Sequence, residues 1–421
     1  MENSKIFLYF ICLVSAFGGL LFGYDWVVIG GAKPFYEVYF DIAQSASLQG
    51  LAMTTALIGC LIGAMVAGSL ADRFGRKPLL VTASVLFIVS ALATGCATNF
   101  VLFSLARLAS GIGIGIASTV SPMYIAEVSP AEIRGRMVSI NQMAVVLGIL
   151  SAQIVNMLIA QPVIEGEDLL LSWNVQRGWR WMFWAGAAPA IVFFGLSFFI
   201  PESPVYAQLR LNGPIKNQAG LKELFSGQYT GLLILGLVLA VFQQWCGTNV
   251  IFNYAQEIFL GAGFNVDGMF INIVITGIAN VIFTIVALYT VEKWGRRTLM
   301  LIGSCGLCLI YLILGTCYYF HVTGIMMVVL VVLAISCYAM TLGPITWVLL
   351  SEIFPAKIRG VAMATCTFAL WVGCCTLTYC FPIMNKALGS SGSFWIYSGI
   401  CLAAFIYFVI RCPETKGKEL E

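Results

Sequence analysis

The chain has 421 residues, of which 60% are hydrophobic and 10% are charged, and its mean hydropathy is +0.94. This composition lies far outside that of soluble globular domains and predicts a polytopic membrane protein. The net charge of +3 gives no indication of nucleic-acid binding. The chain has one histidine, His321, in a short outer loop, so a zinc site is not indicated either.

Apolar runs recur along the chain, each long enough to cross roughly 30 Å of hydrocarbon as a helix. About twelve spans are predicted, near 6–30, 51–71, 79–98, 101–126, 138–160, 180–200, 231–260, 269–291, 298–319, 324–350, 361–384 and 393–411. Their length, and the lack of short alternating segments, favour an all-α membrane protein over a β-barrel. The first span is not followed by a cleavage site, so we expect it to be retained.

The positions of lysine and arginine relative to these spans predict the orientation of the chain. Most of these residues fall in loops on one side of the membrane. Only Lys33, Arg177, Arg180 and Lys386 fall in loops on the other side. We therefore expect both termini to be cytoplasmic.

The first span contains GGLLFGYDWVVIGG at residues 18–31, with the carboxylate of Asp25 at its centre. A charge at that depth is costly and indicates a functional site with a partner. The candidate partner is Arg107 in FSLARLASGIGIGIAS of the fourth span, the other charge well inside a span of the first half. No strand precedes the glycines that follow Arg107, so close helix packing is favoured over a nucleotide-binding loop.

Two interpretations of a pair between Asp25 and Arg107 stay open. In the first, the arginine favours the ionised carboxylate while burial favours the neutral acid, so a small rearrangement switches the protonation of Asp25. Asp25 then takes a proton from outside, loosens from Arg107, and releases the proton to the cytoplasm. In the second, the two residues form a permanent ion pair that joins the first and fourth helices.

A polar loop at 203–230 divides the predicted spans into two sets of six, and short phrases recur across it. The pairs are GSLADRFGRKP (68–78) with VEKWGRRT (291–298), AEVSPAEIRGR (126–136) with SEIFPAKIRG (351–360), and PESP (201–204) with PETKG (413–417). Such duplication is typical of transporters whose two bundles rock around a central site. We predict an N-terminal bundle at 1–202, a cytoplasmic linker at 203–230, a C-terminal bundle at 231–412 and a cytoplasmic tail at 413–421.

The recurring acidic and basic residues predict a cytoplasmic gate. Membrane topology alone accounts for basic loops, but not for Glu127 and Glu352, which precede an IRG phrase at the same spacing. Ion pairs at such positions are worth about 0.2–1 kcal/mol each, and several together bias a two-state equilibrium. The predicted gate consists of Asp72, Arg73, Arg76, Glu127, Arg134, Glu292, Arg296, Arg297, Glu352 and Arg359.

The seventh span carries three amides, Gln243, Gln244 and Asn249, in FQQWCGTN. Each amide has an acceptor oxygen and two donor hydrogens, which suits the hydroxyls of a sugar. On a regular helix Gln244 and Asn249 point about 140° apart. A break at Gly247 would bring them onto one cavity, as in the discontinuous helices of transporters. The alternative is that these amides only join helices.

The fourteen cysteines are scattered through apolar spans, where a free thiol behaves as a small hydrophobe. Cys305 and Cys308 have CxxC spacing but lie inside a predicted span without a second pair, so no metal or redox cofactor is expected. The chain also lacks a convincing set of nucleophile, base and orienting residue, so an enzyme is not expected.

Several of these phrases together resemble the sugar porter family of the major facilitator superfamily, in particular its bacterial proton-coupled xylose and hexose symporters. They are GYD, DRFGRKP, SPMYIAE, GWRWMF, PESP, QQWCGTN, EKWGRR, GPITW and PETKG. The resemblance covers essentially the whole chain. It implies twelve transmembrane helices in two pseudo-symmetric six-helix bundles that work by alternating access. It also implies a location in the cell membrane, namely the bacterial inner membrane. The expected partners are a sugar and the lipid bilayer, and one chain with both halves suffices as a monomer.

The resemblance also implies which residues contact the sugar. The family's sugar ligands match Gln142, Gln243, Gln244, Asn249, Asn280 and Trp347, and Trp371 and Phe22 resemble further aromatic residues of the cavity. For Phe22, core packing is an equal alternative. Leu370 stands where xylose-type symporters usually carry an amide, so one hydrogen bond of the pattern is missing.

Within the family, symporters carry an acid at the position of Asp25, whereas passive glucose facilitators carry a neutral residue. The expected function is therefore symport of a monosaccharide, such as xylose or glucose, with a proton as the coupling ion and no cofactor. Two departures bear on this expectation. An acid of some xylose symporters is replaced near Gly186, and Val205 follows PESP where arginine is usual. The alternatives are a passive sugar facilitator and a non-transporting sugar sensor.

Overall fold

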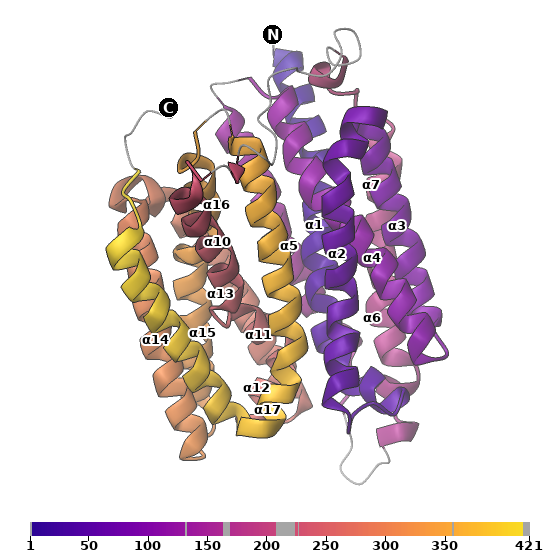
Figure 1. Cartoon of the computed structure of the whole chain (residues 1–421). Helices are drawn as coiled ribbons and strands as arrows, with labels where there is room; N and C mark the ends of the chain where they lie inside the picture. The colour runs from indigo at the N-terminus through magenta and orange to yellow at the C-terminus, as the bar shows by residue number, and fades with distance from the viewer. Residues whose placement is uncertain are drawn as a thin grey trace. The chain divides into compact units, whose positions relative to one another are not determined.

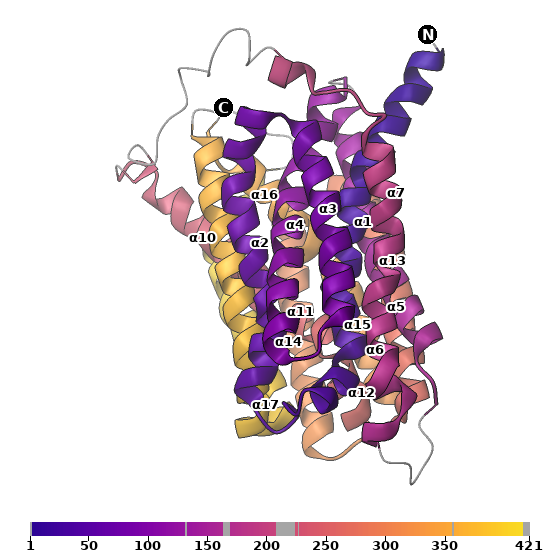
Figure 2. The ribbon, with the colours of Figure 1, turned by 90° about the vertical axis from the view of Figure 1, so that its right-hand side faces the viewer.

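A computed structural model describes residues 2–130, 133–162, 169–207, 224–225, 227–355 and 358–415 of the chain. Every regular element in these ranges is a helix, which confirms the all-α prediction. The chain divides into two compact units, Met1–Ile215 and Lys216–Glu421. Each unit is a bundle of long helices, as Figure 1 and the turned view of Figure 2 show.

The first unit contains five long helices followed by shorter ones. They are α1 (Glu2–Tyr39), α2 (Ala46–Phe74), α3 (Arg76–Cys96), α4 (Phe100–Val128), α5 (Arg134–Ile159), η1 (Leu169–Leu171), η2 (Asn174–Gly178), α6 (Trp179–Ala185) and α7 (Ala187–Ser197). The second unit contains α10 (Thr230–Trp245), α11 (Thr248–Asn253), α12 (Ala255–Gly261), α13 (Val266–Trp294), α14 (Arg296–Tyr319), α15 (Ile325–Met340), α16 (Leu342–Glu352) and α17 (Arg359–Arg411).

Local sequence fixes where several helices begin and end. Asn99 and Asn265 each cap a helix. The side-chain Oδ1 of each accepts the backbone N–H of the third residue of its helix, α4 or α13, at 2.8 Å. Gly75 and Gly295 join α2 to α3 and α13 to α14 with positive φ values of 102° and 82°. Glycine suits these two turns because it has no Cβ to clash there.

Ten helical segments of the described chain are long and apolar enough to cross a membrane, against about twelve expected from the sequence. The expected span at 180–200 is two short helices, α6 and α7, separated at Gly186. The two expected spans at 361–384 and 393–411 both lie in the range labelled α17, which consists of two helices that meet at a kink with non-helical backbone at Gly389. At about 1.5 Å per residue, the helices before and after the kink are each long enough to cross the hydrocarbon layer, so α17 supplies two crossings.

The first helix is longer than its apolar run predicts. We expected a span near 6–30, but the membrane-length part of α1 is Ile6–Tyr39. Lys33, which the sequence places in an outer loop, is inside α1 and 1% exposed, with its Nζ 3.0 Å from Oε1 of Glu37. The two opposite charges lie one helical turn apart and compensate each other, so the helix continues past the end of the apolar run.

Glycines let the helices of the first unit approach closely. A Cβ at Gly23 of α1 would lie 1.9 Å from the carbonyl oxygen of Val145 on α5. A Cβ at Gly111 of α4 would lie 1.9 Å from the carbonyl oxygen of Ala56 on α2. Small residues of this kind allow backbone contact where lipid removes the hydrophobic drive for association. The helices that carry Asp25 and Arg107, α1 and α4, are thus each packed closely against a neighbouring helix.

Candidate functional site

The structure brings Asp25 and Arg107 together. Arg107 donates from Nη1 to Oδ1 of Asp25 at 2.8 Å and from Nη2 to the backbone oxygen of Asp25 at 3.2 Å. Ser110, one turn further along α4, donates to Oδ2 of Asp25 at 2.5 Å. The side chains of Arg107 and Asp25 are 2% and 15% exposed, so the carboxylate keeps limited access to solvent while its counter-ion has almost none.

Aromatic rings surround the Arg107 end of this pair. The guanidinium lies over the ring of Phe183 with 5.4 Å to the ring centroid, a distance typical of a cation–π contact. Phe183 packs against Phe103, one turn before Arg107 on α4, and both rings contact Trp179. Within the described part of the chain, Nε of Arg107 is buried without a hydrogen-bond partner. Asp25 is therefore the strongest interaction available to this arginine.

Part of the predicted gate forms at the α2–α3 turn of the first unit. Arg76 binds Glu127 at 2.9 Å and Asp72 at 3.1 Å. Glu202 accepts the backbone N–H groups of Arg76 and Lys77 at 2.9 and 3.2 Å. A carboxylate stabilises a helix N-terminus in this way, because the first N–H groups have no partner within the helix. Ser203 also donates to Glu127.

The second unit repeats this arrangement at the α13–α14 turn. Arg296 binds Glu352 at 3.0 Å, and Thr415 donates to Glu352 at 2.5 Å. Glu414 accepts the backbone N–H groups of Arg296 and Arg297 at 3.0 and 3.1 Å. The phrases PESP and PETKG thus supply equivalent contacts in the two units.

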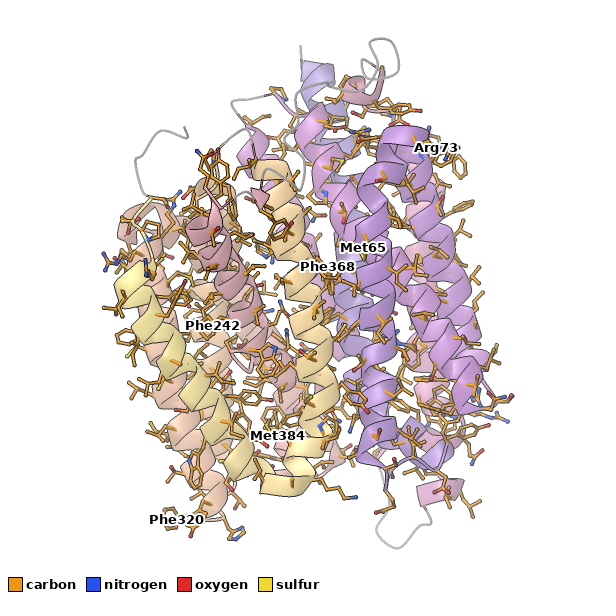
Figure 3. The ribbon with its side chains drawn as sticks, viewed as in Figure 1. Met65, Arg73, Phe242, Phe320, Phe368 and Met384 are labelled. Atoms are coloured by element: carbon orange, nitrogen blue, oxygen red, sulfur yellow. The ribbon has the colours of Figure 1, made fainter. Side chains whose placement is uncertain are left out.

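Five members of the predicted gate make other contacts or have side chains outside the described residues. Arg73, at the end of α2 in Figure 3, places its guanidinium over the ring of Phe74, with 5.2 Å to the centroid. Arg297 donates from Nη2 to the backbone oxygen of Val409 at 2.8 Å. The side chains of Arg134, Glu292 and Arg359 lie outside the described residues.

The three amides of the seventh predicted span are hydrogen-bonded to one another. Gly247, with φ of 88°, separates α10 from α11. Across this break Asn249 donates to Oε1 of Gln244, and Gln244 donates to Oε1 of Gln243 at 3.2 Å. Gln243 donates in turn to the backbone oxygen of Gly343 at 3.1 Å, which joins α10 to α16. The break therefore gathers side chains that a regular helix would direct apart.

The remaining predicted sugar contacts are placed on separate helices of the two units. In the second unit, Asn280 on α13 and Trp371 on α17 are buried, while Trp347 on α16 is 39% exposed. In the first unit, Gln142 is an exposed residue of α5, and Phe22 of α1 packs edge-on against Trp26 with centroids 5.6 Å apart. Leu370, next to Trp371, is 4% exposed.

Sequence reasoning missed three kinds of residue at these sites. Ser110 gave no signal because a serine in a span of glycine and alanine carries no charge, although it lies three residues from Arg107. Phe183 gave none because aromatic residues are common in spans. Glu202 and Glu414 stand in the repeated phrases PESP and PETKG, which indicate duplication and family resemblance but not the contacts of these two glutamates.

Comparison with known proteins gives a consistent match over the whole chain. The family model described as "Sugar (and other) transporter" matches residues 11–213 and again 213–421. The D-xylose-proton symporter of Escherichia coli is 35% identical over 478 residues, covering 100% of this chain and 96% of the relative. The glucose facilitated diffusion protein of Zymomonas mobilis is 29% identical over 466 residues, with 100% and 97% covered.

A solved structure gives the same match in three dimensions. The xylose transporter of Escherichia coli in an inward-open conformation superposes with a TM-score of 0.85 at 35% sequence identity, covering 98% of each chain. Both the sequence match and the structural match extend over both units.

Proposed function

Because the chain belongs to the sugar porter family of the major facilitator superfamily, and is thus a multi-pass sugar transporter with the major facilitator fold, we propose that it carries a monosaccharide together with a proton. The observation that supports coupling is the buried contact of 2.8 Å between Asp25 and Arg107. A titratable carboxylate inside a membrane helix marks a proton path by default. The coupling ion is a proton, and no other cofactor is proposed.

The pair supplies a switch whose two states differ by one charge. With Asp25 ionised, Arg107 is neutralised and α1 is held to α4. With Asp25 protonated, the attraction falls to that between a cation and a neutral acid, while the loss of the carboxylate charge removes part of the desolvation cost. Proton binding from outside thus loosens the contact and permits the change between outward and inward states. Release of the proton to the cytoplasm restores it.

The proposed sugar ligands are the residues that the family resemblance implies. The connected amides Gln243, Gln244 and Asn249 offer hydrogen-bond donors and acceptors. A sugar hydroxyl can take the place of one amide in these hydrogen bonds. The set is completed by Gln142, Asn280, Trp347, Trp371 and Phe22. We propose a pentose or hexose substrate, such as xylose or glucose, because the related proteins named above transport these sugars.

We also propose the setting in which the transport takes place. The excess of lysine and arginine on one side of the spans supports cytoplasmic termini. The similarity to a transporter of Escherichia coli supports a bacterial inner membrane. In the proposed cycle the ion pairs of Arg76 and Arg296 form the cytoplasmic gate, and a monomer suffices.

Accumulation of sugar against its gradient tests the proposal. The purified chain is reconstituted in proteoliposomes with a panel of labelled xylose, glucose and galactose, with and without an imposed pH difference. We expect accumulation of one sugar only when the outside is acidic. Asp25→Asn, which cannot bind the proton, should exchange that sugar across the membrane but not concentrate it.

Two results would contradict the proposal in different ways. Undiminished accumulation by Asp25→Asn would remove Asp25 from the mechanism. Exchange by the unmodified chain without accumulation at any pH difference would assign it to passive facilitators, like the relative from Zymomonas mobilis. Sugar binding without exchange would instead indicate a sensor.

A further inference from the structure

Ser110 on α4 is the second side chain that holds the Asp25 carboxylate, and the proton cycle above does not use it. Its hydroxyl donates to Oδ2 at 2.5 Å, while Arg107 donates to Oδ1 at 2.8 Å. Ser110 is 1% exposed and lies three residues after Arg107, so both side chains leave one face of α4. The two oxygens of Asp25 are therefore held by groups of different chemistry.

That difference determines which oxygen takes the proton more easily. A guanidinium only donates, so a proton on Oδ1 would face an N–H group and require Arg107 to move. A hydroxyl both donates and accepts, so a proton on Oδ2 requires only that Ser110 rotate its O–H bond. After rotation the hydroxyl hydrogen points to a carbonyl one turn back on α4. Ser118 and Thr119 of the same helix bond the Gly115 oxygen in this way, at 3.1 and 3.0 Å.

We propose, resting on the proton-coupled function above, that Ser110 is a positioning residue that makes Oδ2 of Asp25 the proton-binding atom and sets the pH range of sugar uptake. A proton from outside water adds to Oδ2 and gives the neutral acid. Ser110 keeps its own proton and changes from donor to acceptor. When the acid releases its proton to cytoplasmic water, Ser110 donates to the carboxylate again. Arg107 holds Oδ1 until the carboxylate charge is gone.

Few other charged or titratable groups face this part of α1. Tyr24, beside Asp25, donates its hydroxyl to the Met182 backbone oxygen at 3.0 Å. On α6, Arg180 is bound to the backbone oxygens of Gly95 and Ala97. The other charged residues of the packed elements stand towards helix ends: Glu2, Lys5, Lys33 and Glu37 on α1, Glu127 on α4, Arg177 on η2, Arg76 and Lys77 on α3, and Arg134 and Arg136 on α5. The sequence of α7 contains no ionisable side chain. Ser110 and Arg107 are thus the groups whose change acts directly on Asp25.

The test is the pH dependence of proton-driven uptake in proteoliposomes. In Ser110→Ala the ionised carboxylate loses a donor, so Asp25 holds a proton at higher pH. We expect the outside pH of half-maximal uptake to rise by about one unit, a tenfold change in proton concentration. The maximal rate should fall, because release to the cytoplasm becomes harder, while the half-saturation concentration for sugar in exchange stays unchanged.

Matched variants separate this role from a structural one. Ser110→Thr keeps the hydroxyl and should restore the original pH profile. Ser110→Cys keeps nearly the same volume but has only a weak donor, so it should shift the pH profile in the same direction as Ser110→Ala. It replaces the alanine variant in the test if that variant fails to fold. Ser118→Ala removes a hydroxyl that bonds α4's own backbone and should leave the profile unchanged.

The outcomes also separate this inference from the proposed function. If the unmodified chain accumulates sugar but Ser110→Ala and Ser110→Cys keep its pH profile, the role of Ser110 is wrong and symport stands. An equal shift in Ser118→Ala would likewise overturn it. If the unmodified chain exchanges sugar without accumulating it, both the symport proposal and the role of Ser110 fail.

Discussion

Asp25 and Arg107 are each buried only because the other is present, and this mutual dependence can be measured. Arg107→Leu leaves a carboxylate in a largely buried site without its counter-ion, and breaking a buried pair from one side costs about 3–5 kcal/mol. The 15% exposure of Asp25 and its donor Ser110 place the expected loss near the lower value. Asp25→Asn leaves the arginine uncompensated and should also destabilise. The double variant Asp25→Asn with Arg107→Leu removes both charges. Its free energy of unfolding should fall by much less than the sum of the losses in the two single variants.

Thermal unfolding of the four proteins in one detergent measures this coupling. The loss of thermal stability in Arg107→Leu should become smaller as the pH falls, because protonation of Asp25 removes the uncompensated charge. The loss in Asp25→Asn should not depend on pH in this way, which makes it the internal control. Additive losses, equal at all pH values, would show that the two residues do not depend on each other.

The ion pair was predictable from sequence at the scale of residues, but its surroundings were not. Two opposite charges inside apolar spans of one half have few alternatives to pairing with each other. Ser110 and Phe183 depend on how α4 is rotated relative to α1 and α6, and apolar periodicity is weak in helices that face lipid on one side and protein on the other. Lys33 was misplaced because its partner Glu37 lies one turn on, where hydropathy already indicates a loop.

At the scale of elements, the break between α10 and α11 is the feature that assembles the three amides. Gly247 adopts a φ of 88°, and a Cβ there would lie 2.9 Å from Cγ of Tyr397. Both the backbone conformation and the ring exclude a larger residue. A regular helix through this point would separate Asn249 from Gln244 by about 140° around the axis.

Gly247→Ala should therefore weaken sugar binding from a position outside the proposed set of sugar ligands. We expect a loss of about 1–3 kcal/mol in stability from the strained backbone. The half-saturation concentration for exchange should rise several-fold as the contact between Asn249 and Gln244 is lost. Gly399→Ala on α17 is the matched control, because a Cβ there meets nothing within 4 Å. Equal half-saturation values in the two variants would contradict the role of the break.

Helix positions were largely predictable from apolar length, whereas most interruptions within a span were not. The spacing of the amides indicated a break at Gly247 as the condition for Gln244 and Asn249 to share one cavity. Nothing comparable indicated that the expected span at 180–200 divides at Gly186. This division depends on local packing, which a window of mean hydropathy averages out.

At the scale of the whole molecule, the same arrangement occurs once in each unit: a glycine turn, an arginine bound to a glutamate of another helix, and a second glutamate on the following helix N-terminus. The sequence repeat predicted the arginine and glutamate of each pair. It did not predict that Glu202 and Glu414 complete them. The domain boundaries at 202 and 231 stay a prediction.

Burial ranks the gate residues and gives a test of the gate. The side chain of Glu127 is 14% exposed and that of Glu352 is 18% exposed, whereas Asp72 is 64% exposed. A hydrogen bond to a charged group contributes about 1.5–3 kcal/mol to stability where water is excluded, against about 0.2–1 kcal/mol for an exposed ion pair. Neutralising Glu127 and Glu352 together should therefore change the ratio of inward to outward states by about tenfold or more, and Asp72→Asn should change it little.

Hydrogen–deuterium exchange of the full chain in nanodiscs distinguishes a shift of states from local loosening. In the double variant Glu127→Gln with Glu352→Gln, a shift raises exchange in peptides at the α2–α3 and α13–α14 turns. The same shift lowers exchange at the opposite helix ends, near Asn99 and Asn265. Loosening alone raises exchange at the turns without the reciprocal change, because only the bonds of Arg76 and Arg296 are lost. Only the reciprocal pattern, absent from Asp72→Asn, would support a gate that couples the two ends of each unit.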